Sequence, residues 1–223
     1  MKRLTRADTG LRIGVIDTGT NPWHSHVRGG VYGCRIFLDG RGRIGEDDDF
    51  RDLVGHGTAV AGILREELPW VELFSVRVFE QDLTSYPSLV ARAVLRAAAE
   101  GCSILNLSLG MPPGPGSELL TMACTEVLEA GCTIVAAGRP DALPVLPASI
   151  PGVLGTIADD RVTVGEISVD HGRRYPYAAP GSPRDLAGVK SSDNLWGSSF
   201  ACARVTAHIA RFGPDANVPG LAG

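Results

Sequence analysis

Three short segments of the sequence carry side chains whose types suit the activation of a hydroxyl nucleophile. Asp17 follows a short apolar run, His56 lies between two glycines, and Ser198 and Ser199 precede the mostly apolar segment 200–212. A serine hydroxyl becomes a good nucleophile when an imidazole accepts its proton and a carboxylate orients that imidazole. Together the three segments supply the groups needed for acyl transfer.

Each segment also has another interpretation when taken alone. The tripeptide at 17–19, Asp-Thr-Gly, occurs in aspartic peptidases, which need a second such carboxylate that this chain lacks. A related turn binds phosphate in sugar kinases and actin-like ATPases. His56 could be a packed or spectator histidine, although flanking glycines leave its imidazole unscreened. The serine pair could be a simple helix N-cap, but a helix N-terminus also offers N–H groups to developing negative charge.

The order of Asp17, His56 and Ser199, with intervals of 39 and 143 residues, resembles that of the subtilisin-like (subtilase) serine peptidases. Other stretches match that family in the same order, and the resemblance extends over residues 11–211. These stretches are Asn-Leu-Ser-Leu-Gly at 106–110, Val-Ala-Ala-Gly at 135–138 and Ala-Ala-Pro-Gly at 178–181.

The resemblance implies a catalytic role for three residues. Ser199 is expected to be the nucleophile, His56 the general base and Asp17 the group that orients the imidazole. The resemblance also assigns a substrate-lining strand, Ser108, Leu109 and Gly110, and a second oxyanion donor, Ser198, which replaces the family's threonine.

Residue 139 departs from the family pattern, because Arg139 stands where the resemblance implies an oxyanion asparagine. Its guanidinium either folds back as a charge-assisted donor or points to solvent and pairs with Asp141. Pro140 favours the second arrangement, since a proline holds the preceding residue in extended backbone geometry. Losing one oxyanion donor lowers turnover by roughly 10²–10³-fold, so the second arrangement predicts a slow enzyme.

Acidic residues gather at 46–49 and at Asp52, shortly before His56. They form either a solvated loop or a surface that binds basic substrate side chains on the N-terminal side of the cut. The insertion that holds calcium in members of the family is missing after His56, and no zinc-ligand spacing is present. We therefore expect neither a metal nor a cofactor.

The elements that must position these residues alternate between strands and helices. Near-continuous apolar strands separated by helices are typical of an α/β fold, here a three-layer, doubly wound, mostly parallel sheet with helices on both faces. Because functional groups collect at the C-terminal ends of such strands, Asp17, Ser108 and Gly138 should share one rim. We expect strands at 11–16, 72–79, 102–108, 132–137 and 153–157, helices at 56–68, 88–100, 117–130 and 200–212, a loop at 38–55, and irregular structure with short strands at 160–196.

The composition fits a single domain over residues 1–223, with residues 213–223 expected to be a loose tail. A hydrophobic content of 44% excludes a disordered chain, and a net charge of −4 argues against nucleic-acid binding. No apolar run is long enough to span a membrane. Five cysteines without ligand spacing are expected to be free thiols in a reducing compartment, which predicts a cytoplasmic protein.

These features predict a serine endopeptidase that hydrolyses peptide bonds through an acyl-enzyme. The first strand begins near Met1, which leaves no room for the signal and inhibitory propeptide of secreted subtilases. We therefore expect a narrow peptide or protein substrate, such as a precursor peptide, or control by a regulatory partner protein. One alternative is a subtilase fold that has lost catalysis and serves as a binding or scaffold protein. Another is a small-molecule phosphotransferase or hydrolase on a different α/β fold.

Overall fold

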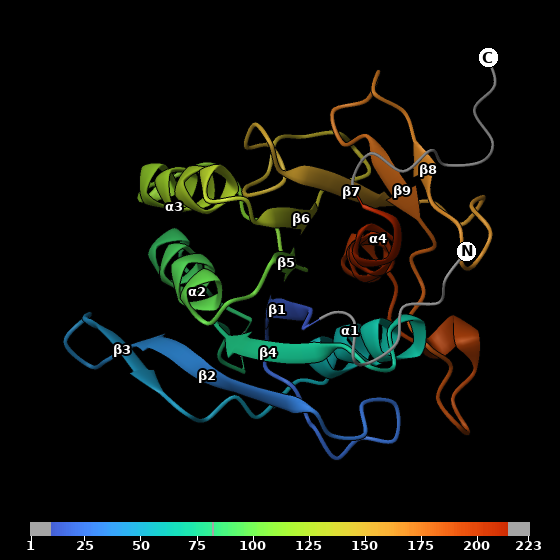
Figure 1. Ribbon diagram of the computed structural model, residues 1–223, viewed down its shortest axis with the longest axis horizontal. Coiled ribbons are helices and arrows are strands. Elements are labelled where there is room, and N and C mark those ends of the chain that lie inside the picture. The colour runs from blue at the N-terminus through green and yellow to red at the C-terminus, as the bar shows by residue number, and fades with distance from the viewer. Residues whose placement is uncertain (1–9, 82, 214–223) are drawn as a thin grey trace.

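The computed structural model describes residues 10–81 and 83–213. A nine-stranded sheet runs through the middle of the molecule in the order β3-β2-β4-β1-β5-β6-β7-β9-β8 (Figure 1). All neighbouring strands are parallel except the two edge pairs, β2–β3 and β8–β9. The strands are β1 Arg12–Asp17, β2 Val31–Leu38, β3 Ile44–Asp47, β4 Glu72–Arg77, β5 Ile104–Leu107, β6 Thr133–Ala137, β7 Leu154–Ala158, β8 Ser168–Val169 and β9 Tyr177–Ala179.

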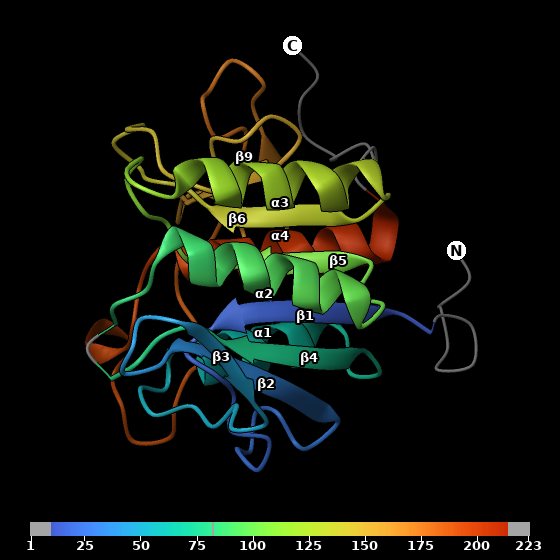
Figure 2. The same cartoon turned by 90° about the vertical axis from the view of Figure 1, so that its left-hand side faces the viewer.

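Four α-helices cover the two faces of this sheet and make the fold three-layered. Helices α2 and α3 lie side by side on one face, and α1 and α4 lie on the other (Figures 1 and 2). One apolar core fills the space beneath α2 and α3, and a second fills the space beneath α1 and α4. The predicted fold class is thereby confirmed. The helices are α1 His56–Glu67, α2 Pro87–Ala99, α3 Ser117–Glu129 and α4 Ser198–Phe212, with a 3₁₀ turn at Ser191–Asp193.

Three expectations about the elements need correction. Strand β2 was not predicted, and the expected loop at 38–55 contains β3, which pairs with β2 as an antiparallel hairpin. β3 is the edge strand and β2 lies between it and β4. Residues of both strands are largely half-buried or exposed, so the strands lack the continuous apolar run that marks the central strands. Helix α4 begins at Ser198 rather than at residue 200. The expected tail after Gly213 lies outside the described residues.

The C-terminal ends of the central parallel strands form one rim, as predicted. Asp17 ends β1, Ser108 directly follows β5, and Gly138 directly follows β6. These strands lie in the order β1-β5-β6, with Ile16 beside Leu107 and Leu107 beside Ala136. Asp17, Ser108 and Gly138 are thus brought to the same edge of the sheet.

The described part of the chain contains no helix that is both long and apolar enough to cross a membrane.

All five cysteines are free, and burial raises the pKa of Cys102 and Cys124 to about 12, which keeps these thiols protonated.

A close backbone approach holds the start of α1 against the end of β1. A Cβ atom on Gly57 would lie 2.1 Å from the carbonyl oxygen of Gly19 and 3.1 Å from the Asp17 side chain. Gly19 itself has φ +103°, and a Cβ atom there would lie 2.5 Å from the Phe50 carbonyl oxygen. Only glycine at these two positions lets residue 56 come next to Asp17.

Replacing Gly57 by alanine should therefore push α1 away from β1. We expect Gly57→Ala to lower the free energy of unfolding by about 3 kcal/mol, near the upper end for overpacking a well-packed site. Urea unfolding measures this change. Gly114→Ala is the matched control, because a Cβ atom there meets only one backbone oxygen at 4.0 Å. Equal stability losses in the two variants would contradict the proposed steric role of Gly57.

Candidate active site

The Asp17 carboxylate and the His56 imidazole form a hydrogen-bonded pair. Asp17 Oδ1 lies 2.7 Å from His56 Nδ1 and also accepts the backbone N–H of Thr18 at 2.6 Å. The Asp17 side chain is only 1% exposed, whereas that of His56 is 25% exposed. Since Nδ1 is held by the carboxylate, the imidazole is oriented with Nε2 left to exchange a proton.

The pair changes the acid–base behaviour of His56. The negative charge of Asp17 and the hydrogen bond to it raise the pKa of His56 above its ordinary value of 6.5, against the opposing effect of burial. The charge of Asp52 adds to this increase. His56 is thus a stronger base than a free histidine.

Asp52 has a structural role that the sequence interpretation missed. Its carboxylate accepts hydrogen bonds from the backbone N–H groups of Val54, Gly55 and Thr58 and from the hydroxyls of Thr18 and Thr58. The N–H of Gly57, next in the first turn of α1, is accepted by the Thr18 hydroxyl at 2.9 Å. These bonds satisfy helix N–H groups that have no intrahelical acceptor, and a carboxylate favours the positive end of the helix dipole. An aspartate shortly before a helix start was the available signal.

The other acidic residues before His56 are engaged with arginines. Asp49 pairs with Arg51 and lies 3.6 Å from the buried Arg77. Of the residues at 46–49, only Asp48 has no ion pair within the described part of the chain, and it is exposed. Most of these carboxylates therefore pair with arginines of the same chain, and the binding of basic substrate side chains by this acidic run stays a prediction. The remaining pairs are Asp47 with Arg35, and Glu46 with Arg92 and Arg96.

Ser199 lies at the start of α4 and is joined to the end of β5 by two reciprocal hydrogen bonds. Its hydroxyl donates to the carbonyl oxygen of Ser108 at 2.9 Å, and the Ser108 hydroxyl donates to the Ser199 carbonyl oxygen at 3.0 Å. The His56 ring packs against Phe200, the next residue, with ring centroids 5.4 Å apart. The fold therefore brings His56 next to the start of α4, which carries Ser199, 143 residues away in sequence. For Ser199 to donate to His56, its hydroxyl would have to rotate away from Ser108.

A buried polar network supports this arrangement from below. Asn106 in β5 is fully buried, donates to the Ser108 hydroxyl at 2.8 Å and accepts from the Thr206 hydroxyl at 2.9 Å. Because each of these groups has a partner, the network fixes α4 relative to β5 without leaving Asn106 unpaired. The network thus positions Ser108 and, through it, Ser199.

The predicted substrate-lining segment contributes mainly backbone. Ser108 and Leu109 are buried, and the Leu109 side chain belongs to the core beneath α2 and α3. Gly110 is exposed, and Met111 exchanges two backbone hydrogen bonds with Leu146. Of the three residues 108–110, only Gly110 is therefore exposed, and a Cβ atom there would lie 3.2 Å from both the Ala137 carbonyl oxygen and the Val145 side chain.

Ser198 contacts the end of β7 through its hydroxyl oxygen, and its role as an oxyanion donor stays a prediction. The Ser198 hydroxyl accepts the backbone N–H of Ala158 at 3.2 Å, which ties the start of α4 to the end of β7. The Ser199 N–H, by contrast, belongs to the first turn of α4, where N–H groups have no intrahelical acceptor. A negative charge beside Ser199 would thus meet a backbone donor.

Arg139 adopts the second of its two predicted arrangements. Its guanidinium makes a two-pronged ion pair with Asp141, with Nη2 2.6 Å from Oδ2 and Nε 3.0 Å from Oδ1. The side chain is 53% exposed. In this arrangement the guanidinium is committed to a surface carboxylate and does not serve the site.

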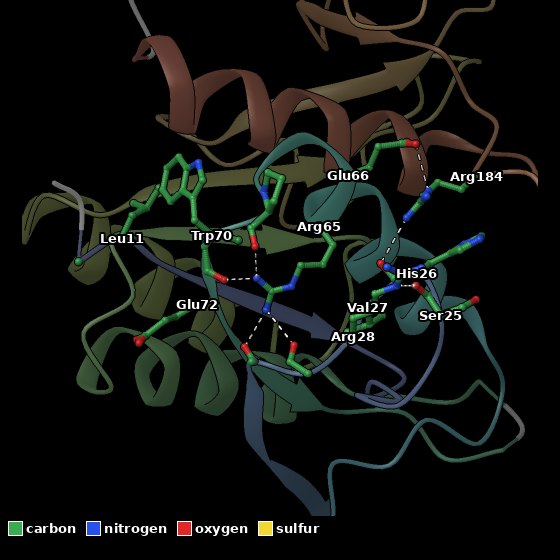
Figure 3. Close-up of a pocket in the computed structure, with 15 residues that line it drawn as sticks. Leu11, Ser25, His26, Val27, Arg28, Arg65, Glu66, Trp70, Glu72 and Arg184 are labelled. Atoms are coloured by element: carbon green, nitrogen blue, oxygen red, sulfur yellow. Dashed lines mark hydrogen bonds and ion pairs between the residues drawn. The ribbon is translucent and has the colours of Figure 1, made fainter. Parts of the chain in front are cut away.

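A large open cavity lies at the other end of α1. It has a volume of about 1080 Å³ and is lined by Arg65, Trp70 and Arg184 among others (Figure 3). Arg65 binds the backbone carbonyls of Gly29 and Gly30, and Arg184 pairs with Glu66, so these cations are already occupied. Among residues 10–81 and 83–213, no group of three or more histidine, cysteine, aspartate or glutamate side chains could hold a metal ion.

The histidine pair gives a direct test of the site electrostatics. We expect His56 to titrate above pH 6.5 and Asp17→Asn to lower its pKa, because the variant removes the negative charge. Since the pKa is raised by folding, the charged pair stabilises the protein below about pH 6.5 and this contribution is lost as pH rises through the folded-state pKa. NMR titration of the imidazoles measures the shift. His26 and His208, whose pKa values are lowered by burial, serve as internal controls. An unchanged His56 pKa in Asp17→Asn would contradict the assignment.

Comparison with known proteins agrees with this arrangement. The chain is 31% identical over 222 aligned positions to Subtilisin-like protease 6 of Arthroderma benhamiae, covering 89% of this chain and 50% of that protein. It therefore spans about half the length of that relative.

Two known structures have similar folds. The prenylagaramide maturation protease PagA has a TM-score of 0.65 and 26% identity, over 92% of this chain and 76% of PagA. The nisin leader peptidase NisP from Lactococcus lactis has a TM-score of 0.69 and 19% identity, over 91% of this chain and 77% of NisP, which shows a common fold. The Subtilase family model matches residues 8–213, nearly the whole sequence. From this match and from the shared fold, the chain belongs to the Subtilase family.

Proposed function

We propose that this chain is a serine endopeptidase that hydrolyses peptide bonds through an acyl-enzyme on Ser199. The observation that carries the proposal is the 2.7 Å hydrogen bond between the buried Asp17 carboxylate and His56, next to the start of α4. Family membership and the similarity to subtilisin-like proteases support the same activity.

In the proposed mechanism, His56 Nε2 accepts the hydroxyl proton of Ser199 as Oγ attacks the substrate carbonyl carbon. Asp17 holds the imidazole by Nδ1 and stabilises the imidazolium that forms. The Ser199 N–H donates to the oxyanion. His56 then protonates the leaving amine, and a water molecule hydrolyses the acyl-enzyme by the reverse sequence. Because His56 must be neutral to act as base, activity rises with pH through its raised pKa.

The proposed substrate is a narrow class of peptide or protein, such as a precursor peptide. The similarity to PagA, which is described as a maturation protease, supports this substrate class. We place the reaction in the cytoplasm, where the five free thiols would stay reduced. A regulatory partner protein that restricts activity is part of the same proposal. Efficient digestion of casein would count against a narrow substrate.

A second candidate function is a binding or scaffold protein that keeps the subtilase fold without catalysis. The ion pair of Arg139 with Asp141 favours it, since residue 139 then gives no oxyanion donor. Labelling by a fluorophosphonate separates the two functions, because only a working Ser199–His56 pair reacts.

Substitution of the nucleophile and the base tests the proposed catalysis. We expect Ser199→Ala and His56→Ala each to abolish fluorophosphonate labelling and peptide hydrolysis. The double variant should be little worse than either single one, because the two groups act as a unit. Ser108→Ala is a useful comparison, as it keeps both reacting groups. Substantial turnover in Ser199→Ala would exclude the acyl-enzyme, and absence of labelling in the wild type would favour the binding protein.

Residue 139 determines how fast the enzyme is in this proposal. We expect Arg139→Asn to raise turnover roughly tenfold, because an amide could reach the oxyanion and a full donor contributes roughly 10²–10³-fold. Steady-state kinetics on a cleaved peptide measure the change. Arg139→Ala is the matched control: it removes the guanidinium without supplying an amide and should leave turnover nearly unchanged. A large loss of activity in Arg139→Asn would show instead that the arginine is the working donor.

A further inference from the structure

Trp196 is an exposed aromatic residue fixed close to the proposed nucleophile. It precedes Ser199 by three residues, and the whole residue is 57% exposed. Its indole Nε1–H donates to Asp160 Oδ2 at 2.8 Å. An exposed tryptophan that is held in one orientation, three residues from the proposed nucleophile, offers an apolar surface to a ligand.

Three further contacts hold the indole in place. The other carboxylate oxygen of Asp160 accepts the N–H of Gly181 at 3.0 Å, and the Gly181 carbonyl accepts the N–H of Gly197 at 2.9 Å. The edge of the indole packs directly on Gly181, where a Cβ atom would come within 2.8 Å of the ring. The ring edge is therefore supported, while much of its surface stays open to solvent. Little side-chain entropy would be lost when a ligand contacts it.

The sheet order tells which side of Ser199 the indole occupies. Ser199 is bound to Ser108 at the end of β5, whereas Trp196 is bound to residues that follow β7 and β9. Strand β6 lies between these two positions. A peptide that crosses Ser199 with its acyl half along 108–110 would therefore extend its other half toward Trp196.

We propose that Trp196 is a specificity residue that contacts an apolar or aromatic side chain of the leaving-group half of the substrate. This inference rests on the proposed acyl-enzyme mechanism. The open part of the ring offers stacking and dispersion contacts to such a side chain, and contacts of this kind contribute about 0.5–1.5 kcal/mol beyond area burial. The preference concerns the residues released first, so it should affect the acceptor and not the acyl group.

Transfer of an acetyl group from Ser199 to an added amine tests this preference. p-Nitrophenyl acetate would form acetyl-Ser199, and phenylalaninamide or glycinamide would compete with water for it. In the transfer the amine nitrogen bonds to the acetyl carbon, the bond to Oγ breaks, and the proton lost by the amine returns to Oγ through His56. We expect the phenylalanine product to form roughly threefold to tenfold faster than the glycine product.

Three variants make the test specific. Trp196→Ala should bring the ratio of the two products close to one, and Trp196→Phe should keep part of the preference. Trp23→Ala is the matched control, because that tryptophan is 88% exposed in the loop after β1, and its ratio should stay at the wild-type value. An unchanged ratio in Trp196→Ala would overturn the inference. Release of p-nitrophenol no faster than with Ser199→Ala would instead remove the proposed mechanism, and the inference with it.

Discussion

The buried carboxylate of Asp17 is the constraint on which the rest of the site depends. A charge that is removed from water is very costly unless it is paired and hydrogen-bonded. Oδ1 has two donors, Thr18 N–H and His56 Nδ1, while Oδ2 is buried without a hydrogen-bond partner among the described residues. The His56 imidazole therefore stabilises the buried charge of Asp17, and Asp17 in turn orients the imidazole.

This requirement explains the local architecture around α1. The helix must start within hydrogen-bond distance of the end of β1, and so Gly57 packs against the carbonyl of Gly19. The N–H groups in the first turn of α1 then have no acceptor within the helix, and β1 supplies none. Asp52 and the Thr18 hydroxyl accept them, and the Asp52 charge also raises the pKa of His56. The Asp52 carboxylate thus both accepts N–H groups around the start of α1 and raises the pKa of His56.

The other half of the site depends on how α4 is anchored. Ser198 joins α4 to β7, and Ser199 joins it to β5, so the two adjacent serines reach opposite sides of β6. Asn106 and Thr206 continue this link inside the core. The anchoring fixes the start of α4 to two strands, while Arg139 separately pairs with Asp141. In the proposed mechanism the oxyanion therefore meets the backbone N–H of Ser199, and the Arg139 guanidinium is held by Asp141.

The sequence by itself determined the central strands, all four helices, the rim that carries Asp17 and the family. These features follow from continuous apolar runs and from residue types in a fixed order, which act locally. The hairpin β2–β3 was missed because its two largely half-exposed strands have no such run. Only the tertiary structure decided which partner each polar group has. Glu46, Asp47 and Asp49 lie beside arginines from β2, β4 and α2. Asp52 accepts N–H groups at the start of α1, and Ser198 binds Ala158, since long-range packing brings these groups together. Residue type gives the chemistry that a side chain can perform, and packing selects which of its contacts forms.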